Sequence, residues 1–163
     1  KRESLEYYQV THHWYLHFHH RTIREASIGL VAPKIRKDLD IPETVQASAR
    51  VNFRLALNAL NDGWLSKGRF LVGDSVTLAD LAAYVEIGQL QNHYTNVFDM
   101  SEFPNIQKWL GEMTKIDGHD DVHVVLKEIG DISREAPTMD TIRQANKRAL
   151  QGLQNKINEI KEA

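Results

Sequence analysis

The densest group of side chains that could bind a metal, exchange protons or hold an anion is a run of histidines near the start of the chain. Five of the eight histidines fall between positions 12 and 20. On a helix, three of them share one face with a glutamate and an arginine, because residues three, four or seven positions apart lie above one another. That face holds Glu6, His13, His17, His20 and Arg24.

The chemistry of this face favours an anion over a metal ion. Two histidines four residues apart can hold zinc or copper, but a catalytic zinc site needs a third protein ligand and groups that orient each ring. The spacing supplies no third ligand, and Arg24 opposes a bound cation. We therefore expect no metal and a face that lines a pocket or a subunit interface, more positive below the unperturbed imidazole pKa of about 6.5. A metal-binding protein centred on His13 and His17 is the weaker alternative.

A second group of possible ligands is the run His119-Asp120-Asp121-Val122-His123. Carboxylates are favoured in the first turn of a helix, where backbone amides and the helix dipole attract negative charge. We interpret Asp120 and Asp121 as residues of such a turn.

Composition limits the class of protein. The chain has 163 residues, 42% of them hydrophobic, which suits one domain with one core. The 20 basic and 22 acidic residues give a net charge of −2, so no broad positive field attracts nucleic acid or a membrane surface. No apolar run approaches the roughly 20 residues of a membrane span. Zero cysteines exclude thiolate chemistry and fit a reducing, cytoplasmic compartment.

Helical periodicity predicts an all-α bundle of about five to six helices, since no run alternates as a strand would. A first helix at about residues 3–31 and a second from Pro42 to near Gly68 would pack antiparallel, joined by a connection at Pro33–Ile41. The inward residues of the second helix step by three and four: Val45, Ala49, Phe53, Ala56, Leu60 and Trp64.

Aromatic residues of the first helix admit two interpretations. Apolar residues on two sides of this helix predict burial on more than one face. Trp14, Tyr15 and Phe18 could form the apolar wall of a substrate pocket, but aromatic residues at helical spacing are more often core.

The sharpest local signal is the segment FLVGDSVTLADL, residues 70–81. Thr77 and Asp80 have the spacing of a capping box, with aspartate in place of the usual glutamate, so a helix is expected to start at Leu78. This helix has almost no charge apart from Asp80 and Glu86, which predicts that it is the central, most buried one.

The remaining helices are shorter or lie at the surface. Phe103-Pro104 opens a short helix whose inward residues are expected to be Ile106, Trp109, Leu110 and Met113. Gly118 separates it from another helix that contains Val122, Leu126 and Ile129. Ala136-Pro137 ends that helix. A bundle domain at 1–135 is therefore expected to be followed by an amphipathic helical extension at 136–163, whose narrow apolar stripe needs something to lie against.

The order of these segments resembles the C-terminal helical domain of glutathione transferases over roughly residues 2–130. FLVGDSVTLADL is followed by FPNIQKWLGEM (103–113) and HDDVHVVLKEI (119–129). The stretches HHRTIRE (19–25) and VHVVL (122–126) favour the theta class. The capping segment also recurs in helical domains attached to translation factors and aminoacyl-tRNA synthetases.

This resemblance implies a role in detoxification, in which glutathione is conjugated to an electrophile. For this reaction the chain would need a partner domain. The helical domain would form one wall of the pocket for a small apolar electrophile and much of a homodimer contact. Glutathione, the co-substrate, and the hydroxyl that activates its sulfur would belong to an N-terminal thioredoxin-like domain, which this chain lacks. The start at Lys1 is accordingly interpreted as that of a domain from a longer or processed protein.

The resemblance assigns no catalytic residue to this chain, which is not expected to conjugate glutathione alone. It makes Arg24, and after it Arg21, the match for a basic residue that faces the active site, where a guanidinium would hold an anionic group. His17, His20 and His13 would line the same region. The extension at 136–163 would act as a lid over the pocket.

A different class of function stays open. The same helices could form a non-catalytic docking module of a larger complex, in which the amphipathic extension engages a partner helix.

Overall fold

Residues 5–162 are described by a computed structural model, and the regular structure within them is entirely helical. The predicted all-α fold is confirmed. Two π-helical turns continue neighbouring α-helices, so the described residues form seven continuous helical rods, compared with the five to six expected.

The first rod is longer than its periodicity predicted. It comprises α1 (Leu5–Phe18), a π-helical turn (His19–Ile23) and α2 (Arg24–Ile35). The expected connection at 33–41 is wrong at its start, because Pro33 lies inside α2. A proline two residues before the end of a helix forfeits one backbone hydrogen bond and leaves little helix to distort.

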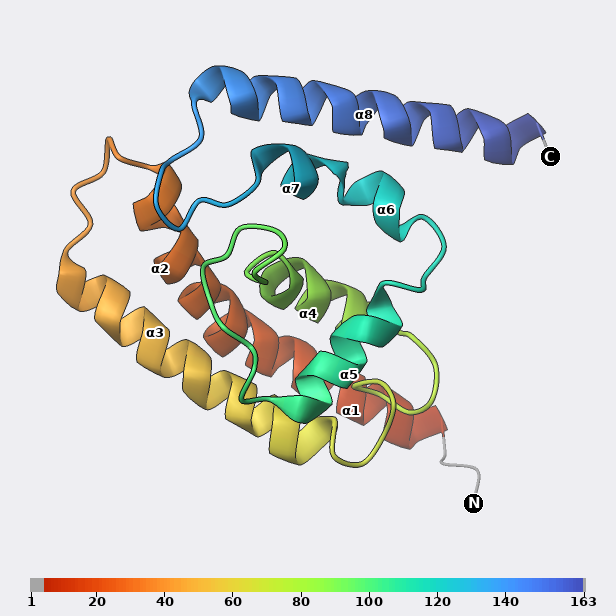
Figure 1. Cartoon of the computed structure of the whole chain (residues 1–163). Coiled ribbons are helices and arrows are strands. Elements are labelled where there is room, and N and C mark those ends of the chain that lie inside the picture. The colour runs from red at the N-terminus through yellow and green to blue at the C-terminus, as the bar shows by residue number, and fades with distance from the viewer. Residues whose placement is uncertain (1–4, 163) are drawn as a thin grey trace.

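The second rod runs antiparallel to the first (Figure 1) and packs closely on it. It comprises α3 (Glu43–Asn58), preceded by Pro42, and a π-helical turn (Ala59–Trp64). The rods approach closely where Gly29 faces Ala49, since a Cβ at position 29 would lie 2.6 Å from the Ala49 Cβ. Glycine at position 29 therefore permits this packing distance. Of the predicted inward stripe, Ala49, Phe53 and Leu60 are buried, whereas Val45 is 47% exposed.

The helix α4 (Leu78–Gly88) lies in the middle of the bundle (Figure 1), as the sequence predicted. Its inner face, including Asp80, Tyr84 and Ile87, is buried. Burial is confined to that face, because Leu78, Leu81 and Val85 are exposed along the other one. No described part of the chain covers the exposed face.

Three short helices complete the bundle. The helix α5 (Pro104–Met113) buries Ile106, Trp109, Leu110 and Met113, all four of the residues predicted to face inward. The next predicted helix is split into α6 (His119–Val122) and α7 (Val124–Ile129). At the break, His123 has φ −94° and ψ 4°, and its Nδ1 lies 2.6 Å from the backbone oxygen of His119.

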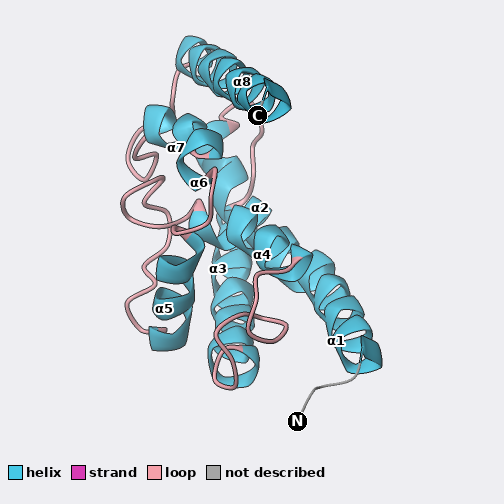
Figure 2. Cartoon of the chain, turned by 90° about the vertical axis from the view of Figure 1, so that its right-hand side faces the viewer, coloured by secondary structure: helices cyan, strands magenta, loops and turns pink. Residues whose placement is uncertain are grey.

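The last helix, α8 (Met139–Glu162), lies along α7 and α6 at one edge of the molecule (Figures 1 and 2). Among its described residues, Ala145 alone is fully buried. In Figure 2 α8 and α1 lie at opposite ends of the molecule, so α8 does not cover α1 in this structure. None of the described helices combines the length and apolarity needed to cross a bilayer.

Candidate functional site

The carboxylate of Asp80 fixes the segment that leads into the central helix. It accepts hydrogen bonds from the Leu71 amide (2.9 Å), the Thr77 amide (3.0 Å) and hydroxyl (2.9 Å), and the Trp109 indole Nε1–H (3.0 Å). The side chain of Asp80 is completely buried, and the capping box with Thr77 is present. One carboxylate thus joins the loop before α4, the start of α4 and the middle of α5.

A buried polar network lies where the first rod meets α4. Glu86 accepts a hydrogen bond from the Ser27 hydroxyl, and its Oε1 lies 3.9 Å from the Arg24 Nη1. The Glu86 side chain is 10% exposed, whereas that of Arg24 is 54% exposed. Arg24 is therefore held at its inner side by a carboxylate while its outer donors stay open to solvent.

Two further groups of this network are neutral near neutral pH. The Tyr15 hydroxyl lies 3.3 Å from the Nδ1 of His19, and both side chains are buried. Burial raises the pKa of the Tyr15 hydroxyl, and the negative charges of Asp80 and Glu86 add to the rise. Burial lowers the pKa of the His19 imidazole, outweighing the opposite effect of Glu86. Neither group is therefore suited to carry charge or to accept a proton from a substrate thiol.

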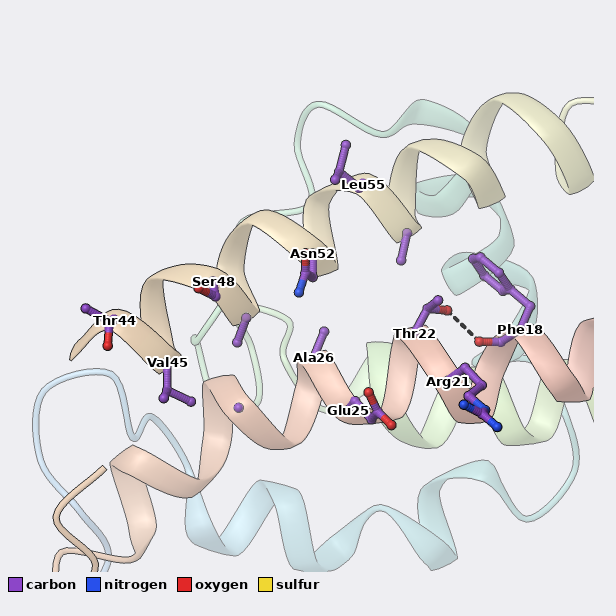
Figure 3. A pocket seen from close by; sticks show the side chains of 13 residues that line it. Phe18, Arg21, Thr22, Glu25, Ala26, Thr44, Val45, Ser48, Asn52 and Leu55 are labelled. Atoms are coloured by element: carbon purple, nitrogen blue, oxygen red, sulfur yellow. Dashed lines mark hydrogen bonds between the residues drawn. The ribbon is translucent and has the colours of Figure 1, made fainter. Parts of the chain in front are cut away.

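A groove of about 670 Å³ follows the line along which the first rod packs on α3 (Figure 3). Arg21 and Glu25 border it from the first rod, and Ser48, Asn52 and Leu55 border it from α3. Arg21 and Arg24 consequently face different neighbours: Arg21 borders this groove, whereas Arg24 pairs with Glu86 of α4.

The outer side of α1 presents large apolar side chains that no described part of the chain covers. Trp14 is 72% exposed and Leu5 75% exposed beside a recess of about 1300 Å³, which the segment from Ala59 to Asp74 closes on its other side. Tyr15 and Phe18 instead pack on Trp64, with ring centroids 5.6 and 5.0 Å away. The three aromatic residues thus differ in location. Tyr15 and Phe18 pack in or against the core, and Trp14 faces the recess.

Comparison with protein families matches residues 13–117, more than half of the chain, to the C-terminal domain of glutathione S-transferases. The chain belongs to this family. No curated protein and no solved structure gives a significant match. The chain is thus a glutathione S-transferase helical domain, in a family whose members pair with a thioredoxin-like domain and dimerise.

The residues predicted to bind substrate all lie in the matched part of this glutathione S-transferase domain. His13 borders a smaller recess of about 340 Å³ with His12 and Tyr8. His17 and His20 are exposed on the same rod, as is Arg24. Within residues 5–162 no three histidine, aspartate or glutamate side chains are arranged to hold a metal ion.

A second titratable cluster of the domain contains His119 and His123, which the sequence singled out, together with two tyrosines that it did not. The Tyr84 hydroxyl lies 2.8 Å from Nε2 of buried His119, whose ring stacks on that of His123 at a centroid distance of 4.2 Å. Tyr94 stacks on the other side of His123, at 5.8 Å. The spacing of four between the two histidines was the available signal. Asp120 lies in the first turn of α6, as does Asp121.

Proposed function

We propose that this chain is the pocket-forming domain of a theta-like, cytoplasmic glutathione transferase that conjugates glutathione to small apolar electrophiles. The observation that carries the proposal is the uncovered side of α1, where exposed Trp14 and Leu5 stand beside the large recess. An exposed aromatic side chain at the rim of a concave surface suits an apolar ligand. Glutathione would be bound mainly by an N-terminal thioredoxin-like domain.

In this proposal the chain contributes position and electrostatics. A hydroxyl of the thioredoxin-like domain would lower the pKa of the glutathione thiol, and this domain would hold the electrophile against the thiolate. Arg24 would bind an anionic group of the substrate or leaving group, because a guanidinium has five donors and Glu86 occupies only its inner side. Glu86 would fix the direction of the guanidinium.

The proposed enzyme is a homodimer. The groove between the first rod and α3 supports a subunit contact there, since it is lined partly by exposed apolar side chains. Val45 and Leu55 are 47% and 61% exposed on its α3 side. The role of α8 as a lid stays a prediction, because its contacts in this structure are with α6 and α7.

The test joins the chain, at its N-terminal end, to the thioredoxin-like domain of a theta-class enzyme and measures conjugation of glutathione to two substrates. One is an uncharged aralkyl halide and the other an aralkyl sulfate. We expect both substrates to react. Trp14→Ala should raise KM several-fold for both. Arg24→Ala should lower the rate of conjugation of the sulfate selectively, and Arg24→Lys should partly restore that rate. The chain alone should be inactive.

Arg54→Ala is the matched control, since Arg54 is an exposed arginine of α3 paired with Glu102. This variant should leave the rate of conjugation of both substrates unchanged. A fusion protein no more active than the thioredoxin-like domain by itself would end the enzymatic proposal. Equal effects of Arg24→Ala on the two substrates would remove the anion-binding role.

The alternative, a non-catalytic docking module, is favoured by one separate observation. The helix α8 presents exposed apolar residues in its C-terminal half, at Leu150, Leu153, Ile157 and Ile160.

A further inference from the structure

The helix α8 has one apolar stripe, of which the fold uses the N-terminal part. That part contains Ile142, Ala145 and Ala149, which are buried or half-buried where α8 packs on α6 and α7. The C-terminal part of the stripe, here called the outer stripe, is exposed. Its members and their exposed fractions are Leu150 (58%), Leu153 (36%), Ile157 (49%) and Ile160 (68%). The domain is thus complete without the outer stripe.

The spacing of the outer stripe is that of a helix-pairing surface. Its four residues follow one another at three, four and three positions, which are the a and d positions of two heptads. Such a stripe is narrower than the apolar face with which helices enter lipid, and lipid-binding helices commonly add aromatic residues that this stripe lacks. The geometry suits another helix better than a bilayer.

Charge decides which helix fits. With Leu150 at position a, every charged residue at the flanking e and g positions between 147 and 161 is a lysine. These are Lys147 and Lys161 at e, and Lys156 at g. Glu159 and Glu162 occupy positions c and f, away from the stripe.

A second copy of this chain is a poor occupant. Residues at e and g meet their counterparts across a helix pair and set partner choice. Two copies would set lysines against lysines. Lys147 and Lys161 have no ion pair with any described residue, and Lys156 lies 3.5 Å from Glu159 on its own helix. The open lysines are complementary to glutamates on a different helix.

The surface is also preformed. The buried Ala145 and the ion pair between Arg148 and Glu128, at 2.5 Å, hold α8 against α7. A partner therefore binds a helix that is already folded, which lowers the entropic cost of association.

We propose that the outer stripe of α8 docks an amphipathic helix of another protein, with aliphatic a and d residues flanked by glutamates. The proposal goes beyond the transferase function and does not depend on it, because the stripe shares no residue with the recess beside Trp14.

The test uses the 163-residue chain and two designed helical peptides of about three heptads. Both have leucine at a and d; one has glutamate and the other lysine at e and g. By calorimetry, we expect the glutamate peptide to bind at least tenfold more tightly than the lysine peptide. Leu153→Gln with Ile157→Gln should weaken it at least tenfold, while Lys147→Glu with Lys161→Glu should reverse the preference. All substituted positions are exposed, and circular dichroism checks that each variant folds.

Val85→Gln on the exposed face of α4 is the control for a general loss of apolar surface and should leave binding unchanged. Equal binding of the two peptides, or unchanged binding in the Leu153 and Ile157 variant, would overturn the proposal. Two other occupants are tested with the same variant. If the chain shows no preference between the peptides, and the variant abolishes either self-association of the chain or its binding to phosphatidylglycerol vesicles, the proposal is also overturned.

Discussion

At the scale of single residues, Asp80 connects parts of the chain that would otherwise be joined only by apolar packing. Its four hydrogen bonds reach Leu71, Thr77 and Trp109, and the carboxylate has no exposed surface. A buried carboxylate is tolerated when donors satisfy its oxygens, and removal of the acceptor leaves those donors unpaired in the core.

Asp80→Asn keeps the shape of the side chain but directs an NH₂ group toward donors. We expect the free energy of unfolding to fall by about 2–4 kcal/mol, because buried amide donors lose their acceptor. Urea denaturation measures the loss. Asp74→Asn, at an exposed aspartate of the same segment, should stay within about 0.5 kcal/mol of the parent protein. A similar loss in both variants would contradict the structural role of Asp80.

Two histidines that are buried or half-buried give the stability a pH dependence. Burial lowers the pKa of His19 and of half-buried His123 in the folded state, whereas the unfolded chain titrates near the ordinary value of about 6.5. Between these values the unfolded state binds more protons, so the free energy of unfolding should decrease as the pH falls from about 7.5 to 5.5. His123→Gln should flatten this dependence, and His17→Gln, at an exposed position, should not. Urea titrations at several pH values provide the test.

At the scale of elements, the contact between the first rod and α3 depends on the absence of a side chain. Gly29→Ala would place a Cβ 2.6 Å from that of Ala49, closer than two such atoms can approach. Alanine favours a helix over glycine by about 1 kcal/mol. We nevertheless expect Gly29→Ala to lower the melting temperature, because the rods must separate.

Gly152→Ala supplies the matched comparison for this prediction. Position 152 is also within a helix, and a Cβ there has no neighbouring atom within 4 Å. The same substitution should therefore raise or preserve the melting temperature. If Gly29→Ala raised the melting temperature as much as Gly152→Ala, the rods would pack less tightly than described.

Elements were predictable where local pattern and tertiary packing agree. The four inward residues of α5 and the start of α4 at the capping box follow directly from spacing. The break at His123 was not predictable from local pattern. It depends on the imidazole ring of His123, which hydrogen-bonds to the backbone oxygen of His119 and stacks on the rings of Tyr94 and His119. The sequence also left Trp14 open between a pocket wall and the core, since periodicity marks an apolar face without showing what covers it.

The same limit applies to the candidate site. The spacing of Arg21 and Arg24 placed both on one helix, but only the positions of α3 and α4 show that they face different neighbours. The hydrogen bond between Ser27 and Glu86 joins residues 59 positions apart, beyond the reach of helical spacing.

At the scale of the whole molecule, α8 is an addition to a bundle that closes without it. One described residue of α8 is fully buried, while the core extends over the first two rods, α4 and α5. A chain ending at Ala136 should fold cooperatively, with a smaller loss of thermal stability than Phe53→Ala, which empties a fully buried site. Thermal unfolding followed by circular dichroism compares the two. A truncated chain without a cooperative transition would show that α8 is part of the folding unit.

The three tryptophans occupy three different surroundings. Trp14 stands in solvent on α1, Trp64 is half-buried against Tyr15 and Phe18, and Trp109 is buried with its indole bonded to Asp80. Their emission therefore differs in colour and in access to a dissolved quencher. Emission spectra of the unlabelled protein with and without the quencher therefore distinguish the open face of the first helix from the interior.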